Sequence, residues 1–124
     1  MNRRRTTLLA QGSYYVATGA APFVSRRAFE RATGPKSDWW LVQTVGVLVT
    51  AVGAGLLSAA TSDRVTPEIE LIGAGCAVGL AAIDIVHVAR RRIAPTYLAD
   101  AAVELAVLVA LSSADGPAFR RNEP

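Results

Sequence analysis

Residues 72–92 read IGAGCAVGLAAIDIVHVARRR, and this stretch decides the fold. Its first half is made of small and apolar residues, as in a helix that packs within lipid. Its second half carries Asp84, His87 and Arg91, which fall within an arc of roughly 60° on a helix that turns about 100° per residue. Ionisable residues on one face of a membrane helix are costly, so we expect this face to belong to a functional site.

The distribution of charge around this stretch is typical of a membrane protein. The chain has 124 residues, 52% of them hydrophobic, and its charged residues are gathered between long apolar runs. Membrane proteins place Lys and Arg beside their apolar spans in this way. The basic residues of the chain are therefore explained by their place beside membrane spans. We predict that the chain contacts the lipid bilayer and does not bind nucleic acid.

Four apolar segments predict four helices. The clearest is residues 39–60, because its part from Leu41 onwards carries no charge over a length that crosses a bilayer core. The other helices are expected over 6–24, 67–89 and 95–113, with a mobile tail over 114–124. Short loops then predict an all-α fold, a four-helix transmembrane bundle of up-down-up-down topology that forms a single membrane domain over 1–124.

Two further features of these segments have structural meaning. Phe29 lies among charged residues in the first loop, which predicts a short interfacial helix there. Gly46 and Gly53 share one helix face, and Gly75 and Gly79 form a GxxxG pair that permits close helix packing. We interpret the GxxxG pair as packing inside the bundle, with a dimer face as the alternative.

The polar residues of all four predicted helices gather toward one end of the bundle. Candidate ligand-binding or polar-network residues are Tyr15, Thr18, Gln43, Asp84, His87, Arg91, Asp100 and Glu104. One interpretation is a structural network in which Arg91 and His87 neutralise Asp84, Asp100 and Glu104. The other is a pocket between helices that binds or transforms a small molecule.

The chain lacks the motifs of the common catalytic and metal sites. Cys76 is the single cysteine and His87 the single histidine, so we predict no disulfide, no metal site and no haem or other cofactor. A hydrogen-bonded structural role is favoured for His87, with a general base or proton relay as the alternative. No catalytic residue can be assigned, and whether the chain is an enzyme stays open.

Two runs of sequence resemble a known group of proteins. The layout is similar to the DoxX-like group of small bacterial four-helix integral membrane proteins, over roughly residues 10–111. That group includes quinone-linked accessory subunits and assembly factors, and the resemblance implies such roles without supplying catalytic residues. A single cysteine does not provide the pair that a thiol–quinone role would use. The two runs are Thr33-Gly34-Pro35-Lys36-Ser37-Asp38-Trp39-Trp40-Leu41-Val42, continued by Thr44-Val45-Gly46, and Ile93-Ala94-Pro95-Thr96-Tyr97-Leu98-Ala99-Asp100-Ala101.

These observations lead to two main hypotheses about function, and to a third, a proton-coupled transporter, which would require an oligomer because four helices are too few for one chain with an inverted repeat. The first is an accessory or assembly subunit that works with a larger membrane partner or as a homo-oligomer. The alternative is a membrane-embedded enzyme or binder of a lipid, quinone or isoprenoid, using Asp84, His87, Asp100 and Glu104. We expect the bacterial cytoplasmic membrane, with both termini in the cytoplasm because a basic tail precedes the first helix.

Overall fold

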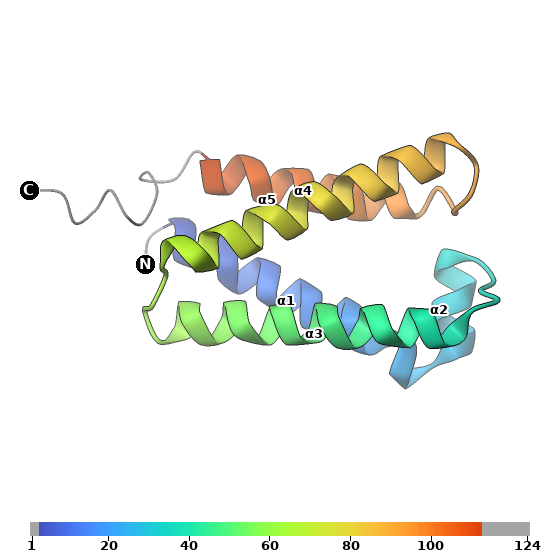
Figure 1. Cartoon of the computed structure of the whole chain (residues 1–124), viewed down its shortest axis with the longest axis horizontal. Helices are drawn as coiled ribbons and strands as arrows, with labels where there is room; N and C mark the ends of the chain where they lie inside the picture. Colours follow the sequence, from blue (N-terminus) through green and yellow to red (C-terminus); the bar gives the residue numbers. More distant parts are fainter. Residues whose placement is uncertain (1–2, 113–124) are drawn as a thin grey trace, which may run out of the picture.

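The computed structural model describes residues 3–112, which form five helices and no strand (Figure 1). The helices are α1 (Arg3–Val24), α2 (Arg26–Thr33), α3 (Trp39–Thr61), α4 (Pro67–Ala89) and α5 (Tyr97–Ser112). The all-helical class is therefore confirmed, and helix α2 occupies the loop in which a short helix was predicted. The tail expected over 114–124 lies outside the described residues.

Local sequence signals explain where the helices begin. Ser25 begins α2, and its hydroxyl accepts a hydrogen bond from the Ala28 amide at 3.1 Å. Thr66 does the same for α4, accepting from the Ile69 amide at 3.3 Å, with Pro67 at the first helical position. A hydroxyl that accepts from a first-turn amide satisfies a donor that the helix itself leaves unpaired.

The long helices pack as two pairs. Helix α1 lies along α3, and α4 lies along α5, whereas α1 with α5 and α3 with α4 make fewer contacts. Figure 1 shows the two pairs close together at the α3–α4 turn and diverging toward the end that carries α2. The larger space between the pairs is therefore at the α2 end.

Glycine pairs hold α1 against α3. Gly12 faces Gly53 and Gly19 faces Gly46, so the two helices are antiparallel. A Cβ on Gly53 would lie 2.8 Å from the Gly12 carbonyl oxygen, and one on Gly19 would lie 2.7 Å from the Gly46 carbonyl oxygen. Close approach was predicted at Gly53, Gly55 and Ala59; it is confirmed at Gly53, whereas a Cβ on Gly55 would have no neighbour within 4 Å in the described chain.

The GxxxG pair behaves differently from the prediction. A Cβ on Gly75 or Gly79 would have no neighbour within 4 Å among the described residues. Packing of this pair inside the bundle was therefore a wrong prediction, because α4 meets α5 through another face that contains Ala77, Ala81 and Asp84. The open Gly75 and Gly79 face leaves room for another molecule.

The outer surface of the helices is apolar. Leu48, Val78 and Val109 are more than half exposed, while the buried cluster of Leu8, Tyr15, Leu56 and Ala60 is small. Helices α3 and α4 are long and apolar enough to cross a membrane, and only 17% and 22% of their most apolar stretches are buried. A core helix of a soluble protein would be mostly buried, so this pattern favours a membrane protein.

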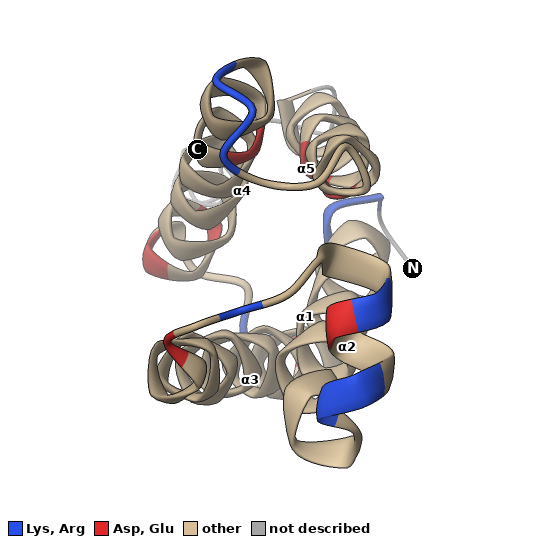
Figure 2. Ribbon diagram, turned by 90° about the vertical axis from the view of Figure 1, so that its right-hand side faces the viewer, with Lys and Arg blue, Asp and Glu red and all other residues tan. Residues whose placement is uncertain are grey.

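Helix α2 and the loop after it lie across one end of the long helices (Figure 2). Phe29 packs edge-on against Trp39 with ring centroids 5.8 Å apart, and the Arg26 guanidinium lies 4.7 Å from the Trp39 ring centre. The Glu30 carboxylate accepts bonds from the Lys36 amide at 2.7 Å and from Arg26 Nε at 2.9 Å. These bonds, the Lys36 amide first, hold the pKa of Glu30 below its ordinary value.

Candidate functional site

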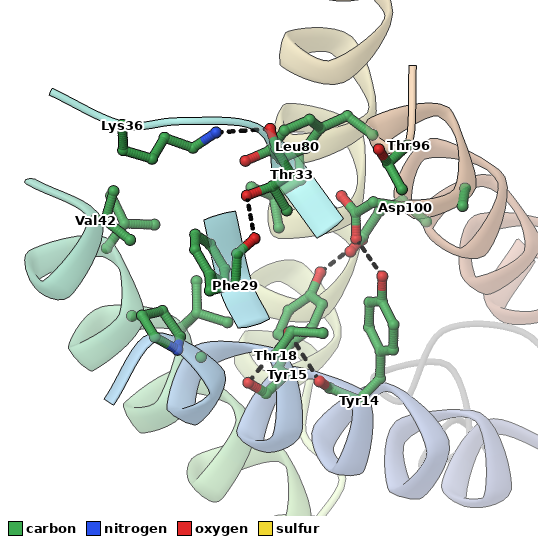
Figure 3. A pocket seen from close by; sticks show the side chains of 18 of the residues that line it. Tyr14, Tyr15, Thr18, Phe29, Thr33, Lys36, Val42, Leu80, Thr96 and Asp100 are labelled. Carbon is green, nitrogen blue, oxygen red and sulfur yellow. Dashed lines mark hydrogen bonds between the residues drawn. The ribbon is translucent and has the colours of Figure 1, made fainter. Parts of the chain in front are cut away.

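A cavity of about 470 Å³ lies between the two helix pairs, next to α2. Helix α3 supplies an apolar wall that contains Val42, Val45 and Val49. Helices α1 and α5 supply the polar lining, referred to here as the polar wall, and Figure 3 shows Tyr14 and Tyr15 extending from α1 toward Asp100. An apolar pocket with a few convergent polar groups is typical of a small-molecule site.

Two tyrosine–carboxylate hydrogen bonds form the polar wall. Tyr14 Oη donates to Asp100 Oδ1 at 2.6 Å, and Tyr15 Oη donates to Glu104 Oε2 at 2.6 Å. Asp100 and Glu104 are four residues apart, so both carboxyls lie on one face of α5. Adjacent tyrosines can reach both carboxyls because the two acids are one helical turn apart.

The polar wall continues toward the narrow end of the molecule. Gln11 Nε2 donates to Tyr15 Oη at 3.1 Å and to the Gly73 carbonyl oxygen at 2.8 Å. A Cβ at Gly73 would lie 2.9 Å from Gln11 Oε1, so the glycine makes room for this amide. Gln11 thus ties α1 to α4 by the same side chain that supports Tyr15.

Asp84 of α4 completes a carboxyl cluster, defined here as Asp84, Asp100 and Glu104. The Asp84 side chain lies next to that of Asp100. Asp84 is only 4% exposed and Glu104 is fully buried. Asp84 Oδ2 and Glu104 Oε1 have no hydrogen-bond partner among the described residues. The cluster therefore has unused acceptor capacity beside the cavity.

The predicted salt-bridge network around this cluster is absent from the described residues. The ion pairs found within residues 3–112 join Arg4 to Glu70 and Arg26 to Glu30, and both are remote from the cluster. Lys36 lines the cavity, but its Nζ donates to the carbonyls of Thr33 and Gly34 at 2.8 and 3.1 Å. Its ammonium also lies 5.4 Å from the Tyr97 ring centre.

Arg91 has a backbone role in place of the predicted ionic one. It is exposed, with φ of +58°, at the turn that ends α4. The Arg91 amide donates to the Val88 carbonyl at 3.0 Å and the Arg92 amide to the His87 carbonyl at 2.8 Å. This is the Schellman arrangement, in which the left-handed residue is usually glycine. The spacing of Asp84, His87 and Arg91 predicted a shared face only if the helix continued through Arg91, and the helix ends before that residue.

The structure brings together five of the eight predicted site residues. Tyr15, Asp100 and Glu104 line the cavity, as does Thr18, whose hydroxyl donates to the Tyr14 carbonyl at 2.9 Å. Asp84 does not line the cavity but lies next to Asp100. The half-buried Gln43 and His87 do not line the cavity, and neither does Arg91.

Sequence reasoning missed several residues of the site. Tyr14 was overlooked because it neighbours Tyr15 but points about 100° away from it on the helix. Phe29, Lys36 and Tyr97 come from α2, the following loop and the start of α5, which meet only in the folded chain. The aromatic and basic composition of the first loop was the available signal.

Within residues 3–112, no group of three or more His, Cys, Asp and Glu residues is arranged to hold a metal ion. Comparisons of the chain with protein-family models, with curated proteins and with solved structures gave no match.

Proposed function

We propose that this chain is an integral membrane protein that binds an amphipathic small molecule, such as a lipid, quinone or isoprenoid, in the cavity beside α2. The observation that carries the proposal is the cavity itself, which combines an apolar wall from α3 with a polar wall from α1 and α5. The apolar wall suits an acyl or isoprenoid chain, and the carboxyl cluster suits a polar head.

In this proposal the four long helices cross the bacterial cytoplasmic membrane as an up-down-up-down bundle, with both termini in the cytoplasm. Helix α1 has 22 residues, or about 33 Å, which matches a hydrocarbon core of roughly 30 Å. Helix α5 has 16 residues, or about 24 Å, and would need a locally thinner bilayer. Helix α2 would then lie at the interface, consistent with its charged face and with Trp39 beside it.

The test is to fill the cavity. Ala99 lines the cavity and is exposed to it, so Ala99→Trp places a large ring where the ligand would lie. Ala82 is exposed on α4 and does not line the cavity, so Ala82→Trp is the matched control. We expect amphiphiles that co-purify in mild detergent, measured by native mass spectrometry, to be lost from Ala99→Trp alone. Equal occupancy in both variants would rule out the cavity as the binding site.

A second function is favoured by the open GxxxG face. A Cβ added at Gly75 or Gly79 would meet nothing within 4 Å in the described chain, so a larger membrane protein or a second copy could pack closely there. The chain would then act as an accessory or assembly subunit. Gly75→Leu should abolish co-purification of such a partner, whereas Gly55→Leu, at another open glycine on α3, should not. Retention of the partner by Gly75→Leu would remove this function.

A further inference from the structure

The carboxyl cluster is a set of acceptors without enough donors. An ionised carboxylate offers about four acceptor sites. Tyr15 Oη occupies one site on Glu104, and Glu104 Oε1 is left without a partner although the residue is fully buried and lines the cavity. Asp84 Oδ2 also has no partner among the described residues, although Asp84 does not itself line the cavity. An unsatisfied buried acceptor costs free energy unless a ligand donates to it.

The cluster also lacks a positive partner. Buried charges in proteins are usually paired, and the ion pairs of residues 3–112 lie elsewhere. Lys36, the basic residue that lines the cavity, directs its ammonium to the Thr33 and Gly34 carbonyls and to the Tyr97 ring. Three neighbouring carboxyls without a cation would favour a ligand that supplies both positive charge and hydrogen-bond donors.

The rest of the cavity is compatible with such a ligand. Tyr14, Tyr15 and Phe29 place aromatic rings around the cavity, and aromatic rings attract ammonium groups. Val42, Val45 and Leu80 provide apolar surface for an alkyl chain. A head group at the polar wall and a chain along α3 would therefore both find suitable surroundings.

Ligands of other charge fit less well. A quinone presents carbonyl acceptors, but the hydroxyls of Tyr14 and Tyr15 already donate to Asp100 and Glu104. A phosphate or carboxylate head would be repelled by the carboxyl cluster. A primary ammonium has three donors and no acceptor, which complements the free oxygens of the cluster.

We infer that the cavity recognises a cationic amphiphile, an alkylammonium compound whose head group is held by Asp100 and Glu104. This inference rests on the proposed function, since it assumes that the cavity beside α2 is the binding site. It selects amine-bearing lipids and lipophilic amines from the wider class of amphipathic molecules.

The experiment compares dodecylamine with dodecanol, which has the same chain and an uncharged head. Calorimetry measures the binding of each compound to the full chain near neutral pH, in nanodiscs made of lipids that carry no net charge. We expect dodecylamine to bind about tenfold or more tightly than dodecanol, as a charge-assisted hydrogen bond to a buried carboxylate would give. Equal affinities for the two compounds would overturn the inference.

Matched variants locate the effect. Glu104→Gln keeps the shape and an acceptor but removes the charge, and should lose most of the preference for the amine. Glu68→Gln is the control, because Glu68 is exposed in the first turn of α4, away from the cavity. Asp100→Asn, at the other carboxyl that lines the cavity, provides a second variant if Glu104→Gln fails to fold, as judged by its melting in detergent. An amine preference that all three variants keep would contradict the inference.

Failure of the inference and failure of the proposed function give different results. If a short-chain quinone binds, is excluded by Ala99→Trp, and dodecylamine does not bind, the cavity is a binding site but the inferred ligand class is wrong. If Ala99→Trp changes the binding of none of the three probes, the proposed function itself is wrong.

Discussion

Individual residues at the ends of α3 and α4 adopt a backbone conformation that the sequence does not favour. Asp63 and Arg91 have φ of +55° and +58°, and each is followed by an amide that bonds back into its helix. Both turns are Schellman arrangements without the usual glycine. For Arg91 this backbone role replaces the ionic role expected from the sequence.

Replacing Arg91 by glycine should therefore stabilise the protein. A left-handed residue with a Cβ is strained, and glycine relieves that strain at some cost in unfolded-state entropy, for a net gain of about 0.5–1 kcal/mol. Arg92→Gly is the control, since Arg92 does not have a positive φ. The free energy of unfolding in one detergent is the measurement. If Arg91→Gly lowered the free energy of unfolding more than Arg92→Gly does, the result would instead support an ionic role for Arg91 in a salt-bridge network.

At the scale of helices, glycines on α1 and α3 decide the closest packing. The backbone of the facing helix lies within 3 Å of where a Cβ would be at each of four glycines, Gly12, Gly19, Gly46 and Gly53. Gly55, Gly75 and Gly79 have open space instead. The same residue type thus has opposite roles, depending on which helix face is covered.

Gly53→Ala should destabilise the chain by about 1–3 kcal/mol, because its Cβ would meet the Gly12 carbonyl and α3 would have to move. Gly75→Ala should be neutral or stabilising by up to about 1 kcal/mol, since alanine favours a helix and meets nothing. Unfolding in mixed micelles measures both. Similar losses in the two variants would show that Gly75 is also packed.

The packing of helix α2 against Trp39 should depend on pH, because it depends on the ionised carboxylate of Glu30. Because the pKa of Glu30 is lowered by the Lys36 amide and Arg26, its contribution is complete above the unfolded-state pKa of about 4.3 and is lost as pH falls through the lower folded value. Acidification below roughly pH 4 should release Arg26 from Trp39. Tryptophan fluorescence in a Trp40→Phe background reports this change.

Glu30→Gln is the control for this transition, because its amide does not titrate. Its fluorescence at neutral pH should already resemble that of the parent at low pH. An acid transition that is the same in Glu30→Gln and in the parent would assign the pH dependence to another group.

At the scale of the whole molecule, hydrogen bonds and the apolar cluster around Leu8 and Leu56 join the two helix pairs. Tyr14 bonds to Asp100, Tyr15 bonds to Glu104, and Gln11 bonds to the Gly73 carbonyl. Thr96 Oγ1 also donates to the Ala32 carbonyl at 2.7 Å, which ties the start of α5 to α2. These links span the space between diverging pairs, so the cavity is a consequence of how the pairs are held apart.

Four crossings of the membrane would place the two termini on the same side. Reporters fused in turn before Met1 and after Pro124 should therefore both be active in the cytoplasm, or both outside it. Signals on opposite sides would require an odd number of crossings. Helix α1 or α5 would then lie on the membrane surface or within another protein.

The sequence by itself determined the helices of this protein and predicted its two candidate membrane spans. Long charge-free runs such as Leu41 to Ala60, Ser25 and Thr66 at helix starts, and Pro67 after Thr66 act locally, so they can be recognised without tertiary contacts. The sequence also indicated Tyr15, Asp84, Asp100 and Glu104, because buried acids and polar stripes on apolar helices are conspicuous.

Only the tertiary structure decided which polar residues meet. Spacing along one helix put Asp84 with His87 and Arg91, but α4 ends in a left-handed turn at Arg91, and Asp84 meets Asp100 across the α4–α5 contact. The choice between packed and open glycines has the same origin. Helical periodicity defines faces, whereas the neighbour of each face depends on how separate helices pack, and that is a property of the whole chain.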